Sequence, residues 1–245
     1  MSEKTQDVLL DSNAYFRLAP SVRPLLKEMF GQTPQYSLHV LAELDDEYNT
    51  STRLRHKFEW VRNAEYRQDR QCKRYELRGQ ARTETLNAFS FLVSYADQQR
   101  LNLSREDLKA LATGYVKGIP VVTDDRDMRT VAEAHSIECW NLIKLLKVMV
   151  TGGRIDMEKV TEVLEYLDYE NDLPMPKDRL RREFKGMLRG RLPDLSARER
   201  QMTDGLRTFD SGVAIVTGAG SGILERPYER IAERRKVHDH GAAAS

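Results

Sequence analysis

Acidic side chains recur just past short apolar runs of this chain. Four of them follow such runs directly or within a few residues: Asp11, Glu43, Asp125 and Asp127. A fifth, Asp107, opens a helical stretch immediately before the apolar residues 119–122. Several carboxylates converging on one cleft repel each other and are costly to bury without a compensating cation. Their hard oxygen atoms suit Mg²⁺ or Mn²⁺, so the pattern predicts a divalent metal site.

The elements that would position these side chains alternate between strand and helix. The apolar runs predict strands at 7–10, 36–40, 119–122 and 137–140. Helical spacing and end signals predict helices at 17–30, around Glu43, through most of 51–100, and at 104–117 and 129–135. Such alternation implies a parallel sheet covered by helices on both faces, a three-layer α/β/α fold. Ligands of these sheets bind at the carboxyl ends of the strands, where the acids are expected.

Each acid also has an ordinary structural explanation. Asp107 follows Ser104 at the spacing of a capping box, so its carboxylate could simply satisfy backbone N–H groups. The acids at 124, 125 and 127 favour the positive end of the following helix whatever their function. Asp11 fits a turn, and Glu43 fits a solvated helix position. Any one of these acids could have only its structural role. Their shared position at the strand ends nevertheless indicates that they have a function as a set.

The chain divides by composition into three parts. Residues 1–150 are predicted to form the α/β domain, with a long basic helical insertion at 51–100. Residues 151–205 are predicted to form a helical appendage, with amphipathic helices at 157–169 and 178–188. Residues 206–245 form a Gly-rich tail that we expect to be flexible. The segment 213–223 looks like the phosphate loop of short-chain dehydrogenases, but too few residues follow it for the rest of that fold.

Basic residues gather in two segments although the net charge is only +1. Residues 53–82 hold ten Lys/Arg against four Asp/Glu, and residues 177–200 hold nine against four. From these segments we predict six residues that bind nucleic acid: Arg53, Arg55, Lys57, Arg62, Arg181 and Arg182. Solvated helix faces are the alternative, and the second segment also suits an acidic partner surface. Four aromatic residues lie in the first segment, and we favour packing against the sheet over stacking on bases for most of them: Phe58, Trp60, Tyr66 and Tyr75.

The remaining composition indicates the compartment. Cys72 and Cys139 lack metal-like spacing, and we interpret them as free thiols. No apolar run approaches the roughly 20 residues that a membrane span requires. The first residues lack the apolar stretch of a secretory signal. We therefore expect a cytoplasmic protein without a membrane association.

Four acidic motifs occur in the order and spacing of the PIN domain family, which the chain resembles over roughly residues 7–145. Leu9-Leu10-Asp11-Ser12-Asn13 resembles the opening motif of that family, and Leu41-Ala42-Glu43-Leu44 resembles its second acidic motif. Residues 107–127, ending in Val-Val-Thr-Asp-Asp-Arg-Asp, resemble its third and fourth motifs. The long basic stretch at 51–100 and the added C-terminal region depart from compact members of the family.

The resemblance implies a Mg²⁺- or Mn²⁺-dependent endoribonuclease acting on single-stranded RNA. It implies Asp11, Glu43, Asp107 and Asp125 as catalytic metal ligands. Asp127 is a weaker fifth ligand, and Asp124 replaces Asp125 if the register is shifted. Asn13 and Thr123 would orient the ligands by hydrogen bonds.

The same resemblance suggests biological settings and partners. A growth-inhibiting toxin neutralised by an antitoxin-like protein and an RNA-processing enzyme are comparable interpretations, and a homodimer is a family-based expectation. The rival from another class is a non-catalytic module of the same fold that binds RNA or protein through the basic segments.

Overall fold

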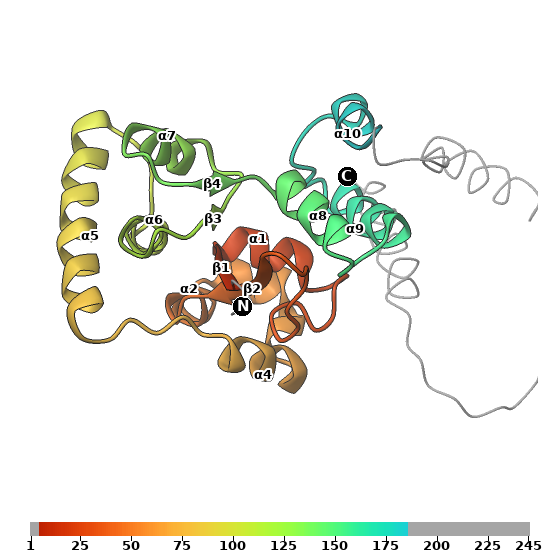
Figure 1. The fold of residues 1–245 in the computed structure, drawn as a ribbon, viewed down its shortest axis with the longest axis horizontal. Coiled ribbons are helices and arrows are strands. Elements are labelled where there is room, and N and C mark those ends of the chain that lie inside the picture. Colours follow the sequence, from red (N-terminus) through yellow and green to blue (C-terminus); the bar gives the residue numbers. More distant parts are fainter. Residues whose placement is uncertain (1–4, 186–245) are drawn as a thin grey trace, which may run out of the picture. The chain divides into compact units, whose positions relative to one another are not determined.

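A computed structural model of the chain describes residues 5–185 (Figure 1). It contains four strands: β1 (Thr5–Leu10), β2 (Gln35–Val40), β3 (Val121–Val122) and β4 (Cys139–Trp140). Helices up to the middle of the chain are α1 (Ser12–Leu18), α2 (Glu43–Thr50), α3 (Thr52–Lys57), the 3₁₀ helix η1 (Glu59–Arg62), α4 (Ala64–Cys72) and α5 (Gly79–Gln99). The later helices are α6 (Arg105–Lys117), α7 (Arg126–Ala134), α8 (Leu142–Thr151), α9 (Met157–Tyr169) and α10 (Lys177–Phe184).

The four strands form one parallel sheet in the order β2-β1-β3-β4. Leu10 is level with Val40 on one side and with Val122 on the other, and Val122 is level with Trp140. The carboxyl ends of all four strands therefore lie at one edge of the sheet. Together with the helices on both faces, this confirms the predicted α/β fold class, and helices follow it at the C-terminal end.

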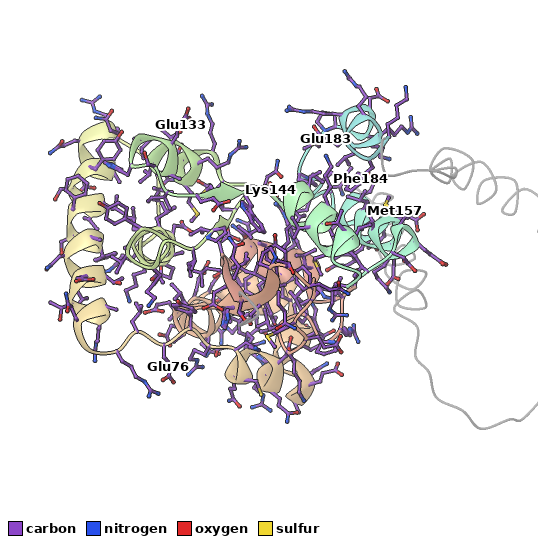
Figure 2. All side chains as sticks on the ribbon, in the orientation of Figure 1. Glu76, Glu133, Lys144, Met157, Glu183 and Phe184 are labelled. Carbon is purple, nitrogen blue, oxygen red and sulfur yellow. The ribbon has the colours of Figure 1, made fainter. Side chains whose placement is uncertain are left out.

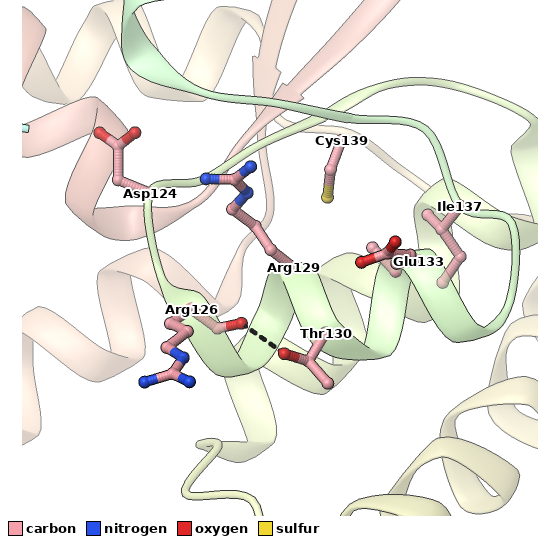
Figure 3. A pocket seen from close by; sticks show the side chains of 8 residues that line it. Asp124, Arg126, Arg129, Thr130, Glu133, Ile137 and Cys139 are labelled. Carbon is pink, nitrogen blue, oxygen red and sulfur yellow. Dashed lines mark hydrogen bonds between the residues drawn. The ribbon is translucent and has the colours of Figure 1, made fainter. Parts of the chain in front are cut away.

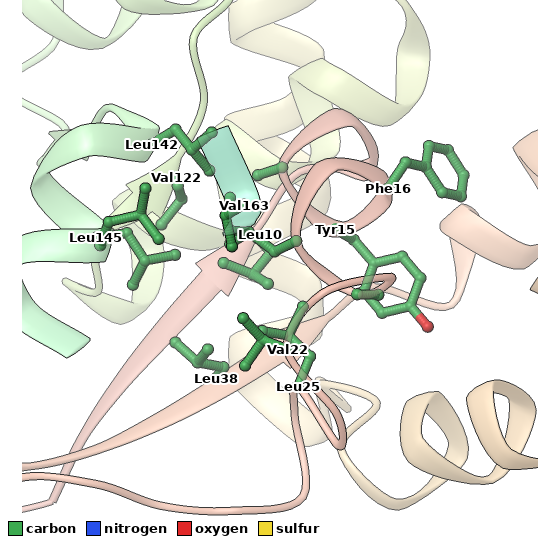
Figure 4. Close-up of a cluster of buried hydrophobic side chains, with 14 of the residues drawn as sticks. Leu10, Tyr15, Phe16, Val22, Leu25, Leu38, Val122, Leu142, Leu145 and Val163 are labelled. Atoms are coloured by element: carbon green, nitrogen blue, oxygen red, sulfur yellow. The ribbon is translucent and has the colours of Figure 1, made fainter. Parts of the chain in front are cut away.

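Alternation along the strands divides the core into two clusters, because successive side chains of a strand point to opposite faces. Leu9 and Val121 pack with buried residues of α5, α6 and α7. Leu10 and Val122 pack on the other face with α1, α8 and α9, as the side chains around Leu10 in Figure 4 show. The three layers are thus held by apolar burial on both faces of a short sheet.

The helix predicted at 17–30 is wrong. The helix there begins at Ser12 and ends at Leu18, and the residues after it follow turns and bends. Pro20 and Pro24 explain the end, because proline lacks the N–H group that would continue the helical hydrogen bonds. The segment is fixed instead by the buried Asp69 carboxylate, which accepts the backbone N–H groups of residues 25, 26 and 27 at 2.9–3.0 Å.

Other elements differ from expectation mainly at their ends. The strands expected at 119–122 and 137–140 keep only their last two residues, and the helix expected at 129–135 begins at Arg126. The stretch 51–100 is helical except around 73–78.

The C-terminal helices α9 and α10 pack onto the same apolar cluster as α1 and β1. Phe184 of α10 is 1% exposed, and the neighbouring Glu183 accepts a 2.6 Å bond from Lys147 of α8 (Figure 2). The domain limits predicted above stay predictions. Three predicted segments lie outside the described residues: the part of the appendage beyond residue 185, the Gly-rich tail and the dehydrogenase-like segment. Within residues 5–185, no helix is long and apolar enough to cross a membrane.

Candidate active site

Asp11 is the most enclosed carboxylate at the carboxyl edge of the sheet. Its backbone N–H donates to the carbonyl of Val122, and its side chain caps α1 by accepting the N–H of Ala14. The residue is 4% exposed, and its Oδ2 atom has no hydrogen-bond partner among residues 5–185. Burial raises the pKa of Asp11 to about 7. The nearby negative charges of Asp107 and Asp124 act in the same direction.

Thr123 lies next to Asp11, at the end of β3. Its backbone N–H donates to Trp140, and its hydroxyl accepts the N–H of Asp125 at 3.0 Å. The same hydroxyl donates to Met128 Sδ and is the neighbouring group that most opposes the rise in the pKa of Asp11. These contacts fix the turn in which Asp125 caps α7 by accepting the N–H of Met128. Asp125 itself is exposed to solvent.

Asp107 reaches this edge from the first turn of α6. The capping box with Ser104 is present, with both bonds at 3.0 Å, so the ordinary explanation of Asp107 holds. Asp107 is nevertheless half-buried, and burial raises its pKa, with the charge of Asp125 adding to the effect. The Asp107 side chain therefore serves as a helix cap and also interacts electrostatically with the other acids at this edge.

Glu43 makes a different contact from the one expected of a metal ligand. It opens α2, and its Oε1 accepts a 2.9 Å bond from Lys109 Nζ of α6. One helical turn later, Glu47 is half-buried, and burial raises its pKa, with the charge of Asp107 contributing. A side-chain hydrogen bond with Ser12 opposes that rise. Sequence reasoning missed Glu47, although its i+4 spacing from Glu43 places both on one face of the helix.

Two acids near Asp125 have other partners. Asp124 accepts a 2.8 Å bond from Arg17 and a 3.2 Å bond from the N–H of Leu142. Burial still raises the pKa of Asp124 against these two interactions. Asp127 accepts the N–H of Asn102 at 2.8 Å. Of the three acids, only Asp125 combines an exposed carboxylate with a direct electrostatic effect on Asp107.

A ready-made metal site is absent from the part of the chain that the structure describes: no three His, Cys, Asp or Glu side chains are grouped as ligands. The chemistry of the acids nevertheless fits a hard divalent cation. Oδ2 of Asp11 is a buried oxygen that needs a positive partner, and the charge of Asp107 raises the pKa of Asp11 while that of Asp125 raises the pKa of Asp107. The residues that fit are Asp11, Asp107, Asp125 and Glu47.

The predicted RNA-binding residues lie away from the acids in the chain, on α3, η1 and α10. Arg53, Lys57, Arg62, Arg181 and Arg182 are exposed, whereas Arg55 is half-buried and donates to Thr52. Lys57 and Arg181 also contact acids, Asp172 at 3.8 Å and Asp178 at 3.4 Å.

The aromatic residues of the first basic segment confirm the packing interpretation. Phe58 stacks on Phe16 with ring centroids 4.7 Å apart, and Tyr66 is buried beside Trp60. Asn13 is exposed, and its side chain makes no hydrogen bond to any residue between 5 and 185.

Comparison with known proteins gives no family model that matches the chain and no curated protein that matches it. Two solved structures are similar. One is FitAcB from Neisseria gonorrhoeae, with a TM-score of 0.37 and 13% identity over 55% of this chain and 97% of that chain. The other is VapBC-5 of the VapBC family of toxin-antitoxin systems from Mycobacterium tuberculosis, with a TM-score of 0.34 and 15% identity over 55% of this chain and 98% of that chain. Similarity of this degree does not assign a family or an activity.

Proposed function

We propose that the chain is a PIN-type endoribonuclease that hydrolyses single-stranded RNA with Mg²⁺ or Mn²⁺. The observation that carries this proposal is Asp11, a buried carboxylate with one unpartnered oxygen at the ligand-binding edge of a parallel sheet. Asp107 and Asp125 reach the same edge from two other elements. Perturbed pKa values gathered at such an edge are typical of functional sites.

The metal would be held by Asp11, Asp107 and Asp125, with Glu47 or Glu43 from α2. Glu47 is favoured over Glu43, because Lys109 already neutralises Glu43. When bound, the metal supplies an activated water and neutralises charge on the phosphate.

The chain's own residues prepare that chemistry. Thr123 fixes the turn between β3 and α7 that carries Asp125, and the N–H of Ala14 holds one oxygen of Asp11 in place. With a pKa of about 7, Asp11 is partly protonated at neutral pH, and it would have to give up that proton to hold a cation. Lys109 places a positive charge beside the acids, where a substrate phosphate would lie.

A non-catalytic module is the second candidate. It is favoured by the lack of a ready-made ligand group in residues 5–185 and by the pairing of Glu43 with Lys109. In this case the basic residues on α3, η1 and α10 would bind RNA or an acidic protein without cleavage. An antitoxin-like partner and a homodimer stay predictions drawn from the family resemblance.

Titration with Mn²⁺ by calorimetry separates the two candidates. The enzyme should bind Mn²⁺ stoichiometrically, and Asp11→Asn should weaken that binding at least ~10-fold, since even indirect disturbance of a ligand costs about that much. Glu158→Gln on α9 is the matched control, because it removes one exposed negative charge and should leave binding unchanged. Absence of Mn²⁺ binding by the folded wild-type protein would favour the module.

A further inference from the structure

A hollow of about 480 Å³ opens along α7, beside the candidate active site (Figure 3). Its lining comes from α7 and from the chain on either side of it: Asp124, Arg126, Arg129, Thr130, Ala132, Glu133, Ile137 and Cys139. The volume lies in the range of sites that hold a small molecule or one nucleotide. Asp124 and Arg126 belong to the acidic motif that ends at residue 127, whereas the other lining residues lie beyond it.

Two arginines and the Asp124 carboxylate line one end of the hollow, and Figure 3 shows the Arg126 side chain pointing away from that of Arg129. Arg126 and Arg129 lie about one turn apart at the start of α7, and both are exposed. Neither guanidinium comes within ion-pair distance of an acid in the described part of the chain, although the charge of Arg129 acts to lower the pKa of Asp124. Figure 3 shows the Arg129 side chain directed toward Asp124 and Cys139. Unpaired guanidinium groups bind phosphate in a bidentate manner, and the start of a helix adds a favourable field for an anion.

The hollow adjoins the acids through the strand ends. Asp124 lines it and is the chain neighbour of Asp125, while Cys139 on the opposite wall belongs to β4, which pairs with β3. The backbone of Asp11 is bonded to Val122, directly before this segment. An RNA strand cleaved at the acids would therefore continue past the hollow.

The far end of the hollow has a different character. Ile137 and Ala132 line it but are almost fully buried, whereas Glu133 is exposed without an ion pair to any residue of 5–185 (Figure 3). A carboxylate accepts hydrogen bonds from amino groups of unstacked bases, and single-stranded RNA is read at such edges.

We propose that this hollow is a subsite for one nucleotide of the RNA strand next to the cleaved bond. Arg129 binds its phosphate, Arg126 adds a second positive charge at the start of α7, and Glu133 accepts a hydrogen bond from its base. This inference rests on the proposed function for its substrate but needs only binding, not cleavage. Glu133 favours bases with an amino group at the Watson–Crick edge over uracil, whose facing oxygens repel a carboxylate.

The test measures binding of a labelled single-stranded RNA to the full chain in EDTA, where metal-dependent cleavage is absent. We expect Arg126→Gln/Arg129→Gln to weaken binding at least ~10-fold. The logarithm of the association constant falls as the logarithm of the salt concentration rises. The steepness of this fall should decrease by about 0.7 for each phosphate that the variant no longer neutralises. Lys117→Gln is the control, because Lys117 is exposed and lies before β3, at the opposite edge of the sheet from the acids. Glu133→Gln should keep overall affinity and reduce the preference for cytosine- and guanine-containing RNA over oligouridine.

Three outcomes overturn the inference. They are equal losses of affinity in the arginine and Lys117 variants, an unchanged salt slope in the arginine variant, and no RNA binding by the wild-type protein. An unchanged base preference in Glu133→Gln overturns the role of that residue. RNA binding that depends on the arginines without any cleavage in Mn²⁺ would support the subsite while refuting the nuclease.

Discussion

Asp11 performs two tasks that conflict in the absence of a cation. One oxygen caps α1, which favours an ionised carboxylate at the helix start. The other oxygen is buried without a partner, which disfavours ionisation. The second effect dominates, because the pKa is raised from 3.8 to about 7. A binding site for a cation resolves the conflict, and this is why Asp11 is central to the account.

Replacing Asp11 by Asn should stabilise the metal-free protein at high pH. A raised carboxyl pKa contributes stability that is present below the unfolded pKa of 3.8 and is lost as the pH rises through about 7. The full shift corresponds to roughly 4 kcal/mol, and Asn keeps the helix cap while carrying no charge. Thermal unfolding in EDTA should therefore give Asp11→Asn a higher Tm than wild type near pH 8. This difference in Tm should be mostly gone near pH 4. A variant that is less stable than wild type near pH 8 would contradict the assigned burial cost.

Some roles at the residue scale could be predicted from sequence, and others could not. Strand ends followed by acids predicted the neighbourhood of Asp11 and Asp125, because parallel strands end at a common edge. The contact between Glu43 and Lys109 depends on how α2 lies against α6, which no local pattern encodes. The choice among Asp124, Asp125 and Asp127 likewise depends on remote partners, Arg17 and Asn102.

Helices and loops show the same division between local and remote causes. The Ser104 cap and the Gly118 end of α6 agree with the sequence signals, because both act within a few residues. The helix expected at 17–30 is absent because Pro20 and Pro24 interrupt it, although the apolar residues there have helical spacing. The apolar residues of that segment are buried all the same, held by the distant Asp69. Apolar spacing thus identified the core residues there but not the backbone that carries them.

Arg17 joins three elements next to the candidate active site. Its guanidinium contacts Asp124 after β3 at 2.8 Å and Asp172 after α9 at 2.6 Å, and both acids are partly buried. Arg17→Met should lower the free energy of unfolding by about 1–3 kcal/mol, between the values of exposed and buried ion pairs. Denaturant unfolding checks this, and Arg17→Met/Asp124→Asn should recover part of the loss because Asp124 no longer leaves an unpaired charge, while Asp172 still does. Full additivity of the two substitutions would refute the coupling.

At the scale of the molecule, one parallel sheet positions the acids at the carboxyl ends of its strands. The described C-terminal helices cover one face of this sheet and add to its apolar core. The apolar residues of α9 and α10 belong to the cluster that contains Leu10 and Val122, the strand residues directly before the acidic segments. The layer order was predictable because alternation of strand and helix permits few arrangements. The packing of α9 and α10 on this face was not, because amphipathic helices indicate a buried side but not its partner.

The measurement that tests the central claim most directly is cleavage of a mixed single-stranded RNA pool by wild type and by Asp11→Asn. Each protein is assayed with Mn²⁺ and with EDTA, and both are checked for folding by circular dichroism. The account predicts cleavage by wild type only with Mn²⁺, and a loss of at least ~100-fold in Asp11→Asn, as expected when a group that positions the metal is removed. Cleavage that persists in EDTA or in folded Asp11→Asn would contradict the account, as would folded wild type that fails to cleave with Mn²⁺.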